Sequence, residues 1–347
     1  MAGTFASCIS LKSLNLSSFN TENVEIMYAL FSFFDELTSL NLSNFNTTKV
    51  KYMSRMFNYC FSLKLLDLSN FNTINVKNMS QMFFICSSLE SLNLSSFNIK
   101  NVVYMNHMFS NCTSLKILDI SNFNTEKVVD MSFMFNSCGS LTSLDLSNFN
   151  TRNVQSMDYL FRYCSNLISL NLSNFDTSKV NDMYAMFYRC TSLETLDLSN
   201  WSNEKLITMR SMFNGCESLE SLNLSHFNTT NVNNMNYLFW NCASFKSLDL
   251  SSFNTQNVES MNSMFWNCSS LESIDLSHFV MKNSSINVYG LFFGCISLRN
   301  IDISNFIFEK NFTLFDILPD NCEIKINNKS YGKIEKISNR YTIITDL

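Results

Sequence analysis

The sequence predicts an α/β solenoid in which each repeat, about 26 residues long, supplies one short parallel strand and one helical segment. Two observations predict this fold. The cysteines recur at a constant spacing from Cys60, Cys86 and Cys112 to Cys268, and at a spacing one position longer from there to Cys322. The repeat around them reads LxxLDLSNFNTxxVxxMxxMFxxCxS, and its two halves carry different hydrophobic periods. Such self-similarity is typical of solenoids, whose repeats bury their apolar faces only against their neighbours.

The first half of the repeat predicts the strand. In residues 63–68 the two leucines Leu66 and Leu68 alternate with the polar Asp67. Alternation with a period of two places both leucines on one face of a strand and the aspartate on the other. We therefore expect each repeat to contain one strand that is buried on one face and open to solvent on the other.

The second half of the repeat predicts the helical segment. Its apolar residues are spaced by 3, 3, 1, 3 and 3 positions, as in Val50, Met53, Met56, Phe57, Cys60 and Leu63. This spacing places them in one stripe of a helix or of tight helical turns. The polar SNFNT stretch between the two halves then forms a corner, where Asn46 or Thr47 serves as the N-cap of the helical segment.

Strands on a concave face with helical segments outside give a leucine-rich-repeat horseshoe. The array is predicted to span residues 1–305, with about 12 repeats of which the first is truncated. The methionine pair disappears after that point. Residues 306–347 are therefore predicted to form a degenerate final repeat and a C-terminal cap, because the last coil of a solenoid must be covered.

The sulfur atoms of the repeat allow three interpretations. Soft sulfur ligands can bind copper(I), regularly spaced cysteines can form a disulfide ladder, and methionine and cysteine can simply fill a core. The methionines and the cysteine share the stripe that faces the strand leucines, which favours the core. We expect free, buried thiols whose pKa is raised, no metal site and no cofactor.

Composition and charge weigh against several classes of function. The 24 Lys+Arg are scattered and the net charge is −5, so no basic surface for nucleic acid or anionic membrane is expected. No window of 18 uncharged apolar residues predicts insertion into a membrane. No Ser, His and Asp set and no phosphate-binding loop is recognisable. The sequence does not predict an enzyme.

The repeat LxxLDLSNFNTxNVxxMxxMFxxCxSL resembles that of the BspA-like leucine-rich-repeat surface proteins, a lipoprotein-type repeat, over about residues 5–298. The resemblance implies a noncatalytic, adhesin-like scaffold at the cell surface or secreted, whose partners are other proteins such as host or extracellular matrix proteins. The sequence shows no export signal or anchor. A cytoplasmic scaffold for protein–protein interactions therefore stays the alternative.

A column of acidic and amide residues on the concave strand face is the candidate partner-binding surface. The column contains Asp67, Asp119, Asp145, Asn171, Asp197, Asn223, Asp249, Asp275 and Asp302. Carboxylates on neighbouring strands repel one another, so we expect partly raised pKa values. A bound Ca²⁺ and a purely solvating role are the alternatives. An extended polar strip of this kind suits a protein surface better than a small-molecule pocket.

Overall fold

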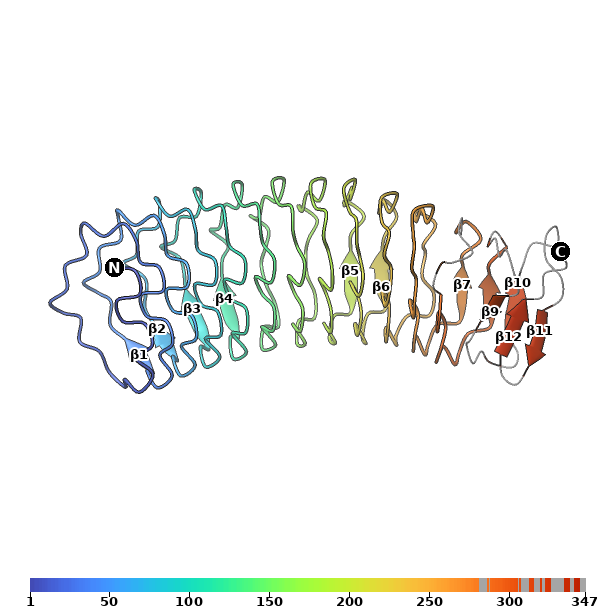
Figure 1. Ribbon diagram of the computed structural model, residues 1–347, viewed down its shortest axis with the longest axis horizontal. Helices are drawn as coiled ribbons and strands as arrows, with labels where there is room; N and C mark the ends of the chain where they lie inside the picture. The colour runs from blue at the N-terminus through green and yellow to red at the C-terminus, as the bar shows by residue number, and fades with distance from the viewer. Residues whose placement is uncertain are drawn as a thin grey trace. The chain divides into compact units, whose positions relative to one another are not determined.

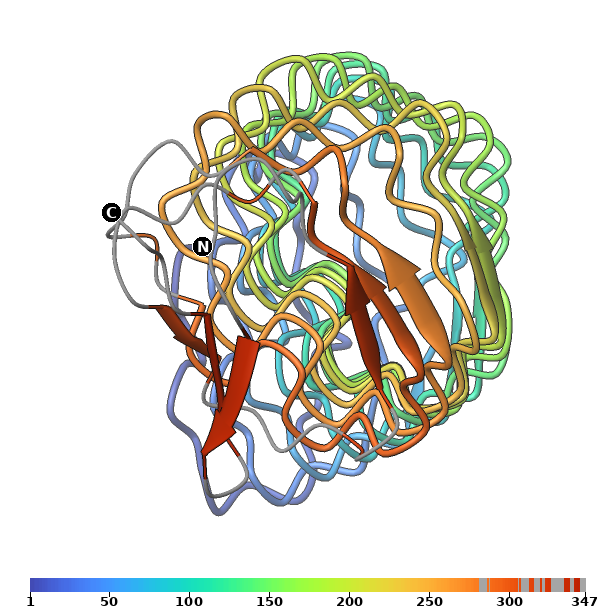
Figure 2. The same cartoon turned by 90° about the vertical axis from the view of Figure 1, so that its right-hand side faces the viewer.

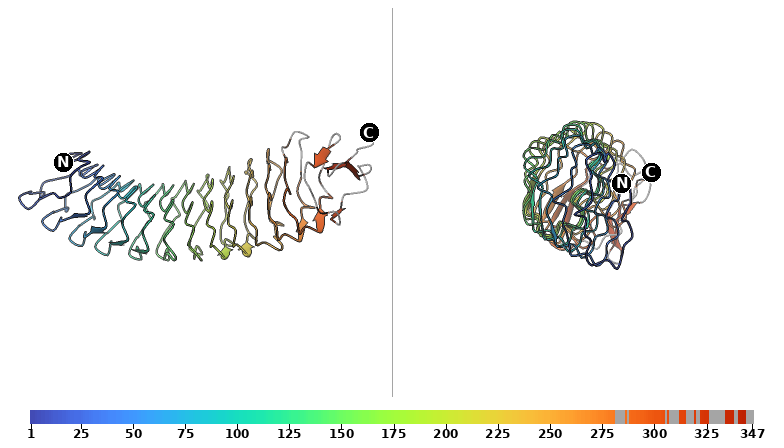
Figure 3. Two further views of the ribbon diagram at one scale, coloured as in Figure 1. Left: turned by 90° about the horizontal axis from the view of Figure 1, so that it is seen from below. Right: turned by 90° about the vertical axis from the view of Figure 1, so that its left-hand side faces the viewer.

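The computed structural model describes residues 1–280, 286, 288–304, 306, 312–314, 319, 322–325, 334–337 and 340–343. Its contacts divide the chain into two compact units, Met1–Phe175 and Asp176–Leu347. Within each unit the chain winds into successive coils that stack on one another (Figures 1 and 3). Each coil corresponds to one sequence repeat. The predicted boundary at residue 305 stays a prediction.

Four of the strands predicted for the first unit are present and parallel, whereas no strand forms at the equivalent residues 143–145 and 169–171. They are β1 (Ser39–Leu40), β2 (Leu65–Leu66), β3 (Ser91–Asn93) and β4 (Ile117–Asp119). β1 pairs with β2, and β3 pairs with β4. The register of both pairs is one repeat, as in Leu92 opposite Leu118. The leucine of each strand is buried and its outer residues are exposed, as the alternation predicts.

The strands of the second unit follow the same plan. They are β5 (Thr195–Asp197), β6 (Ser221–Asn223), β7 (Ser273–Asp275), β8 (Asn300–Asp302), β9 (Phe312–Leu314), β10 (Glu323–Lys325), β11 (Ile334–Ile337) and β12 (Arg340–Ile343). β5 pairs with β6 in parallel, and β7, β8 and β10 form a parallel sheet (Figure 2). β9, β12 and β11 form a separate antiparallel sheet. Most of the predicted cap, 306–347, lies outside the described residues.

The predicted helical segment is wrong, because the described part of the chain contains no helix. The MxxMFxxC stretch of each repeat, called the turn segment from here on, is a run of turns instead. Alternate N–H groups of the segment bond to the next coil, as Arg55 N–H does to the carbonyl of Ser80 at 3.0 Å. The N–H groups between them close turns within the coil, as Asn58 N–H does to the carbonyl of Arg55 at 3.2 Å.

The spacing of the coils explains why a helix does not form. An α-helix is about 10 Å wide, whereas paired strands lie about 4.8 Å apart. A run of turns allows the turn segments to stack as closely as the strands, and a ladder of parallel bridges from Ile26 to Ser156 joins them in the first unit. Two residues of most turn segments, such as Arg55 and Tyr59, have a φ near +59°. This left-handed conformation breaks any helix.

The interior of each coil is lined by the residues that the stripe predicted. Met53, Met56, Phe57 and Cys60 are all at most 1% exposed, and their counterparts in other coils are buried likewise. The inner phenylalanines stack between successive coils within each unit at centroid distances of 5.5 to 5.8 Å. The core interpretation of the sulfur cluster is therefore confirmed.

The corner threonine joins coils instead of capping a helix. Thr47 Oγ1 accepts a hydrogen bond from the N–H of Asn72 at 2.7 Å and donates one to the carbonyl of Asn72 at 2.9 Å. Thr73 repeats this pair of bonds with Asn98 of the following coil. One buried hydroxyl thus pairs with both the N–H and the carbonyl of one residue. These bonds stabilise the fold, because a buried polar main-chain group without a hydrogen bond costs free energy. The predicted N-cap role of Asn46 or Thr47 is wrong.

Candidate functional site

The nine residues predicted to bind a partner share one position of the repeat, and five of them, Asp119, Asp197, Asn223, Asp275 and Asp302, end the strands β4 to β8. In each of them Oδ1 accepts a hydrogen bond from the N–H of the serine two positions later, at 2.8 to 3.2 Å. The residues are Asp67, Asp119, Asp145, Asn171, Asp197, Asn223, Asp249, Asp275 and Asp302. This Asx turn closes the strand and starts the corner. An aspartate and an asparagine supply the same acceptor, so the turn accounts for both residue types in the column.

The expectation of raised pKa values in this column is wrong. The N–H of Ser147, followed by its hydroxyl, lowers the pKa of Asp145 below its ordinary value of 3.8. The pKa of Asp119 is also lowered, and the hydrogen bond from the Ser121 hydroxyl is the largest cause. The negative charge of Asp145 acts in the opposite direction but has a smaller effect. Hydrogen bonds to the charged form therefore outweigh repulsion between coils. The remaining aspartates of the column shift in the same direction.

The strand face also carries apolar side chains and shallow hollows. Leu65 and Ile117 occupy the outward position before the buried leucine and are 69% and 70% exposed. In the second unit, a hollow of about 360 Å³ lies over β5 and β6. Another of about 300 Å³ lies over β7, β8 and β10, where Lys325 Nζ bonds to Asp302 Oδ2 at 2.7 Å. The strand face is thus partly apolar, acidic and hollowed.

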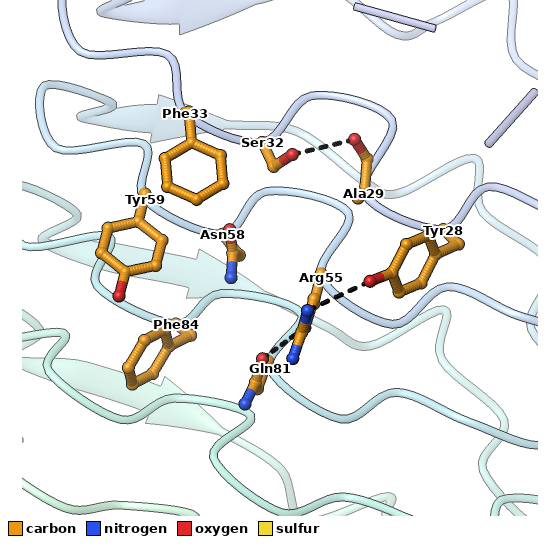
Figure 4. Close-up of a pocket in the computed structure, with 9 residues that line it drawn as sticks. All are labelled: Tyr28, Ala29, Ser32, Phe33, Arg55, Asn58, Tyr59, Gln81 and Phe84. Carbon is orange, nitrogen blue, oxygen red and sulfur yellow. Dashed lines mark hydrogen bonds between the residues drawn. The ribbon is translucent and has the colours of Figure 1, made fainter. Parts of the chain in front are cut away.

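A second candidate site lies on the turn segments of the first unit, at a pocket of about 360 Å³. The rings of Tyr28, Phe33, Tyr59 and Phe84 form its walls (Figure 4). Phe33 and Tyr59 stack at a centroid distance of 4.7 Å, and Phe84 meets Tyr59 edge-on at 5.3 Å. Tyr28 and Phe33 are 39% and 42% exposed, so the pocket is open to solvent. We call it the aromatic pocket.

Arg55 crosses the aromatic pocket between two anchoring acceptors. Its Nε donates to Gln81 Oε1 at 2.6 Å, and its Nη1 donates to the Tyr28 hydroxyl at 3.1 Å (Figure 4). The guanidinium carbon lies 5.9 Å from the centre of the Tyr28 ring. No carboxylate of the described residues forms a salt bridge with Arg55. The pocket therefore holds a fixed cation that lacks an acidic partner.

A row of aromatic side chains leads away from the aromatic pocket across the following coils. His107 meets Phe84 edge-on at 5.5 Å and stacks on Phe133 at 4.3 Å, and Phe133 stacks on Tyr159 at 4.3 Å. Burial lowers the pKa of His107, against a smaller opposite effect of Asp130. His107 is thus a neutral member of an aromatic row rather than an isolated surface residue.

The sequence reasoning missed the aromatic pocket because its residues occupy no single position of the repeat. Tyr59 stands one residue before the cysteine, Phe84 stands two before it, and Arg55 stands one before the second methionine. Only the stacking of coils brings these positions into contact. A scan for aromatic and arginine residues at all exposed positions of the turn segment would have found the cluster.

None of the twelve cysteines forms a disulfide bond, and the ten that are buried belong to the core. In most coils the thiol donates to the carbonyl of the inner phenylalanine of the preceding coil, as Cys164 does to Phe135 at 3.1 Å. Burial raises the pKa of Cys112, Cys164 and Cys216 to about 12. Among the residues that the structure describes, no group of three metal-binding side chains occurs. Within those same ranges, no helix has the length and apolarity needed to span a bilayer.

Comparison with known proteins adds a family match. The family model described as "Mycoplasma protein of unknown function, DUF285" matches residues 1–118, 104–221 and 190–306. No curated protein matches the chain.

Several solved structures are similar to the chain at low identity. A leucine-rich repeat protein from Bacteroides ovatus is 19% identical, with 84% of this chain and 88% of that one covered and a TM-score of 0.31. A leucine-rich cell surface protein from Faecalibacterium prausnitzii is 18% identical, with 76% and 78% covered and a TM-score of 0.35. The functional domain of InlJ from Listeria monocytogenes, which includes a cysteine ladder, is 16% identical, with 88% and 74% covered and a TM-score of 0.23.

Proposed function

This chain belongs to the DUF285 family, whose repeats fit the BspA-like leucine-rich-repeat family indicated by its sequence motif, and we propose that it is a noncatalytic scaffold that binds other proteins. The strand face is the proposed contact surface. The partners are proteins of a host or of its extracellular matrix, and the chain acts as an adhesin-like protein at the cell surface or after secretion.

The observation that supports this proposal is the combination of fixed charge and exposed apolar side chains on one face. The Asx turns account for the position of each aspartate. The main chains of Leu65 and Ile117 pair with neighbouring strands, but their apolar side chains are 69% and 70% exposed beside the aspartates. The lowered pKa keeps Asp67 and Asp119 ionised at neutral pH. Apolar centres flanked by charge are typical of protein interfaces, and the charge steers the encounter.

A double variant of the strand face tests the proposal. Leu65→Ser combined with Ile117→Ser removes both exposed apolar side chains. Serine is the natural residue at the equivalent position of the preceding repeats, Ser39 and Ser91, so the change fits the strand. We expect surface plasmon resonance against a panel of purified extracellular matrix proteins to show binding by the natural chain and at least ten-fold weaker binding by the variant.

A variant at the residue that precedes a turn segment serves as the matched control. Tyr104→Ser removes an exposed side chain away from the strands and is expected to leave binding unchanged. The strand face is rejected as the contact surface if the double variant binds as the natural chain does. If no matrix protein binds the natural chain, the proposed extracellular partners are rejected.

A cytoplasmic scaffold is the second candidate, and the free thiols favour it. Reducing compartments keep cysteines out of disulfides, and none of the twelve cysteines forms a disulfide bond. Immunolocalisation of the endogenous protein separates the two candidates. Detection on intact, unpermeabilised cells supports the surface assignment, and detection only after permeabilisation supports the cytoplasmic one.

A further inference from the structure

We propose that the aromatic pocket binds a peptide carboxylate that stands next to an aromatic side chain. This pocket lies on the turn segments and shares no residue with the strand face. It is a second binding site, and its existence does not depend on the function proposed for the strands.

The polar groups in the aromatic pocket are arranged as donors. A guanidinium has five N–H groups, and Arg55 uses one for Gln81 and one for Tyr28. Because Gln81 Oε1 and the Tyr28 hydroxyl accept from Arg55, the oxygen atoms of the lining are partly occupied. The Oδ1 atom of Asn58 is an acceptor without a partner, but it is buried beneath the lining. The guanidinium N–H groups that Gln81 and Tyr28 leave over therefore favour a ligand that accepts hydrogen bonds.

The charge and shape of the aromatic pocket favour a carboxylate beside a flat apolar group. The planar fork of a guanidinium matches the two oxygens of a carboxylate, and Arg55 has no acidic partner among the described residues. The exposed rings of Tyr28 and Phe33 offer surfaces on which an aromatic side chain can stack. A terminal phenylalanine places both groups within one residue.

Other anionic ligands fit the aromatic pocket less well. Nucleic acid requires many cations along its phosphates, whereas this pocket contains one arginine and the chain carries a net charge of −5. An acidic sugar presents several hydroxyl donors, which need acceptors that the lining provides sparsely. The aromatic row from Phe84 to Tyr159 extends the apolar surface beyond the pocket, where the preceding residues of a peptide can lie.

Fluorescence polarisation with two labelled peptides tests the inference on the full chain. The probes are fluorescein-Gly-Ser-Gly-Ser-Phe with a free C-terminal carboxylate and the same peptide with a C-terminal amide. We expect the acid to bind about ten-fold more tightly than the amide, since one charge-assisted bidentate pair is lost in the amide. Arg55→Gln is expected to abolish this difference, and glutamine is the natural residue at the equivalent position, Gln81.

Two further variants keep the test specific. Tyr59→Asn, which copies Asn111 of a later coil, is expected to weaken both peptides about equally. Arg152→Gln changes an exposed arginine that pairs with Glu126 outside the pocket, and the ten-fold preference is expected to persist.

Three outcomes would overturn the inference. They are equal binding of acid and amide by the natural chain, a preference for the acid that survives in Arg55→Gln, and no binding of either peptide. Titrations with oligogalacturonate and with inorganic phosphate complete the test. Arg55-dependent binding of one of these, without binding of the acid peptide, would assign the pocket to an acidic sugar or a phosphate group.

Discussion

The cysteine of each repeat combines two properties that few side chains share. It is small and apolar enough for the interior, and its thiol donates a hydrogen bond to a buried phenylalanine carbonyl, as in Cys164 and Phe135. The sequence alone indicated the first property, because the cysteine falls on the apolar stripe. The second could not be predicted, since the carbonyl belongs to the preceding coil.

Substitutions of Cys164 test its place in the core. Cys164→Asp is expected to lower the free energy of unfolding by about 3–5 kcal/mol because it buries an unpaired charge. Cys164→Ala is expected to cost about 1–2 kcal/mol, through a small cavity and the lost hydrogen bond. Urea denaturation of both variants and the natural chain provides the measurement. Equal tolerance of both changes would place this side chain in water.

Asp145 links the strand face to the pH dependence of stability. Its pKa is lowered from 3.8 in the folded chain, so its contribution is complete above 3.8 and is lost as the pH falls through the lower folded value. Asp145→Asn keeps the Oδ1 acceptor for Ser147, as Asn171 does for Ser173, and removes the titration.

Thermal melts at pH 7 and pH 3 measure this effect. The melting temperature of the natural chain is expected to fall more between the two values than that of Asp145→Asn. Asp145→Ala serves as the control, since it removes the turn acceptor and is expected to be less stable at both pH values. An identical pH response of the natural chain and Asp145→Asn would contradict the stabilising role of the carboxylate.

At the scale of the element, the turn segment shows how two structures share one hydrophobic pattern. Apolar spacings of three and four suit a helix, but turns closed between residues three apart, such as Met53 and Met56, place side chains on one face as well. The spacing predicted the buried face correctly and the element wrongly. The choice depends on main-chain N–H groups that bond to the next coil, which leave no trace in side-chain periodicity.

The left-handed positions of the turn segment provide a test of this backbone. Gly290 has a φ of +63°, and a Cβ atom there would lie 2.7 Å from the Trp266 ring. Gly290→Ala is expected to destabilise the chain by about 1–2 kcal/mol, from the left-handed conformation alone, with the ring contact adding to it. Gly139→Ala is the control, because its φ is not left-handed and its nearest neighbour is the Ser165 hydroxyl at 3.3 Å. Urea denaturation showing equal loss in both variants would contradict this account.

At the scale of the molecule, the coils of each unit depend on their neighbours through ladders with a period of one repeat. Pairs such as Leu92 and Leu118, or Tyr52 and Asn78, occupy the same position in successive repeats. Stability in such an array is approximately a sum of repeat and interface terms. The number of coils is therefore less critical than their register.

Deletion of one repeat tests this dependence on register. Removing residues 89–114 deletes one whole repeat. Ser88 is then followed by Leu115, which occupies the same repeat position as Leu89, so the register is kept. The shortened chain is expected to unfold cooperatively in urea, with a smaller m-value because less surface is exposed. Removing residues 89–112 shifts every later coil by two positions and is expected to yield an unfolded or aggregated chain. Equal behaviour of the two deletions would show that register is unimportant.

The sequence by itself determined which side chains of the repeat are buried, which residues a strand occupies where one forms, and how long each coil is, because burial and alternation follow from the order of apolar and polar residues along one repeat. Only the tertiary structure decided that the turn segment is not a helix and that Tyr59, Phe84 and Arg55 share a pocket. These features arise from hydrogen bonds and ring contacts between coils. The bonded main-chain groups lie about one repeat apart in the chain. The pocket combines several positions of the repeat at which the residue type changes from coil to coil, as between Arg55 and Gln81, so it is not visible in any local pattern.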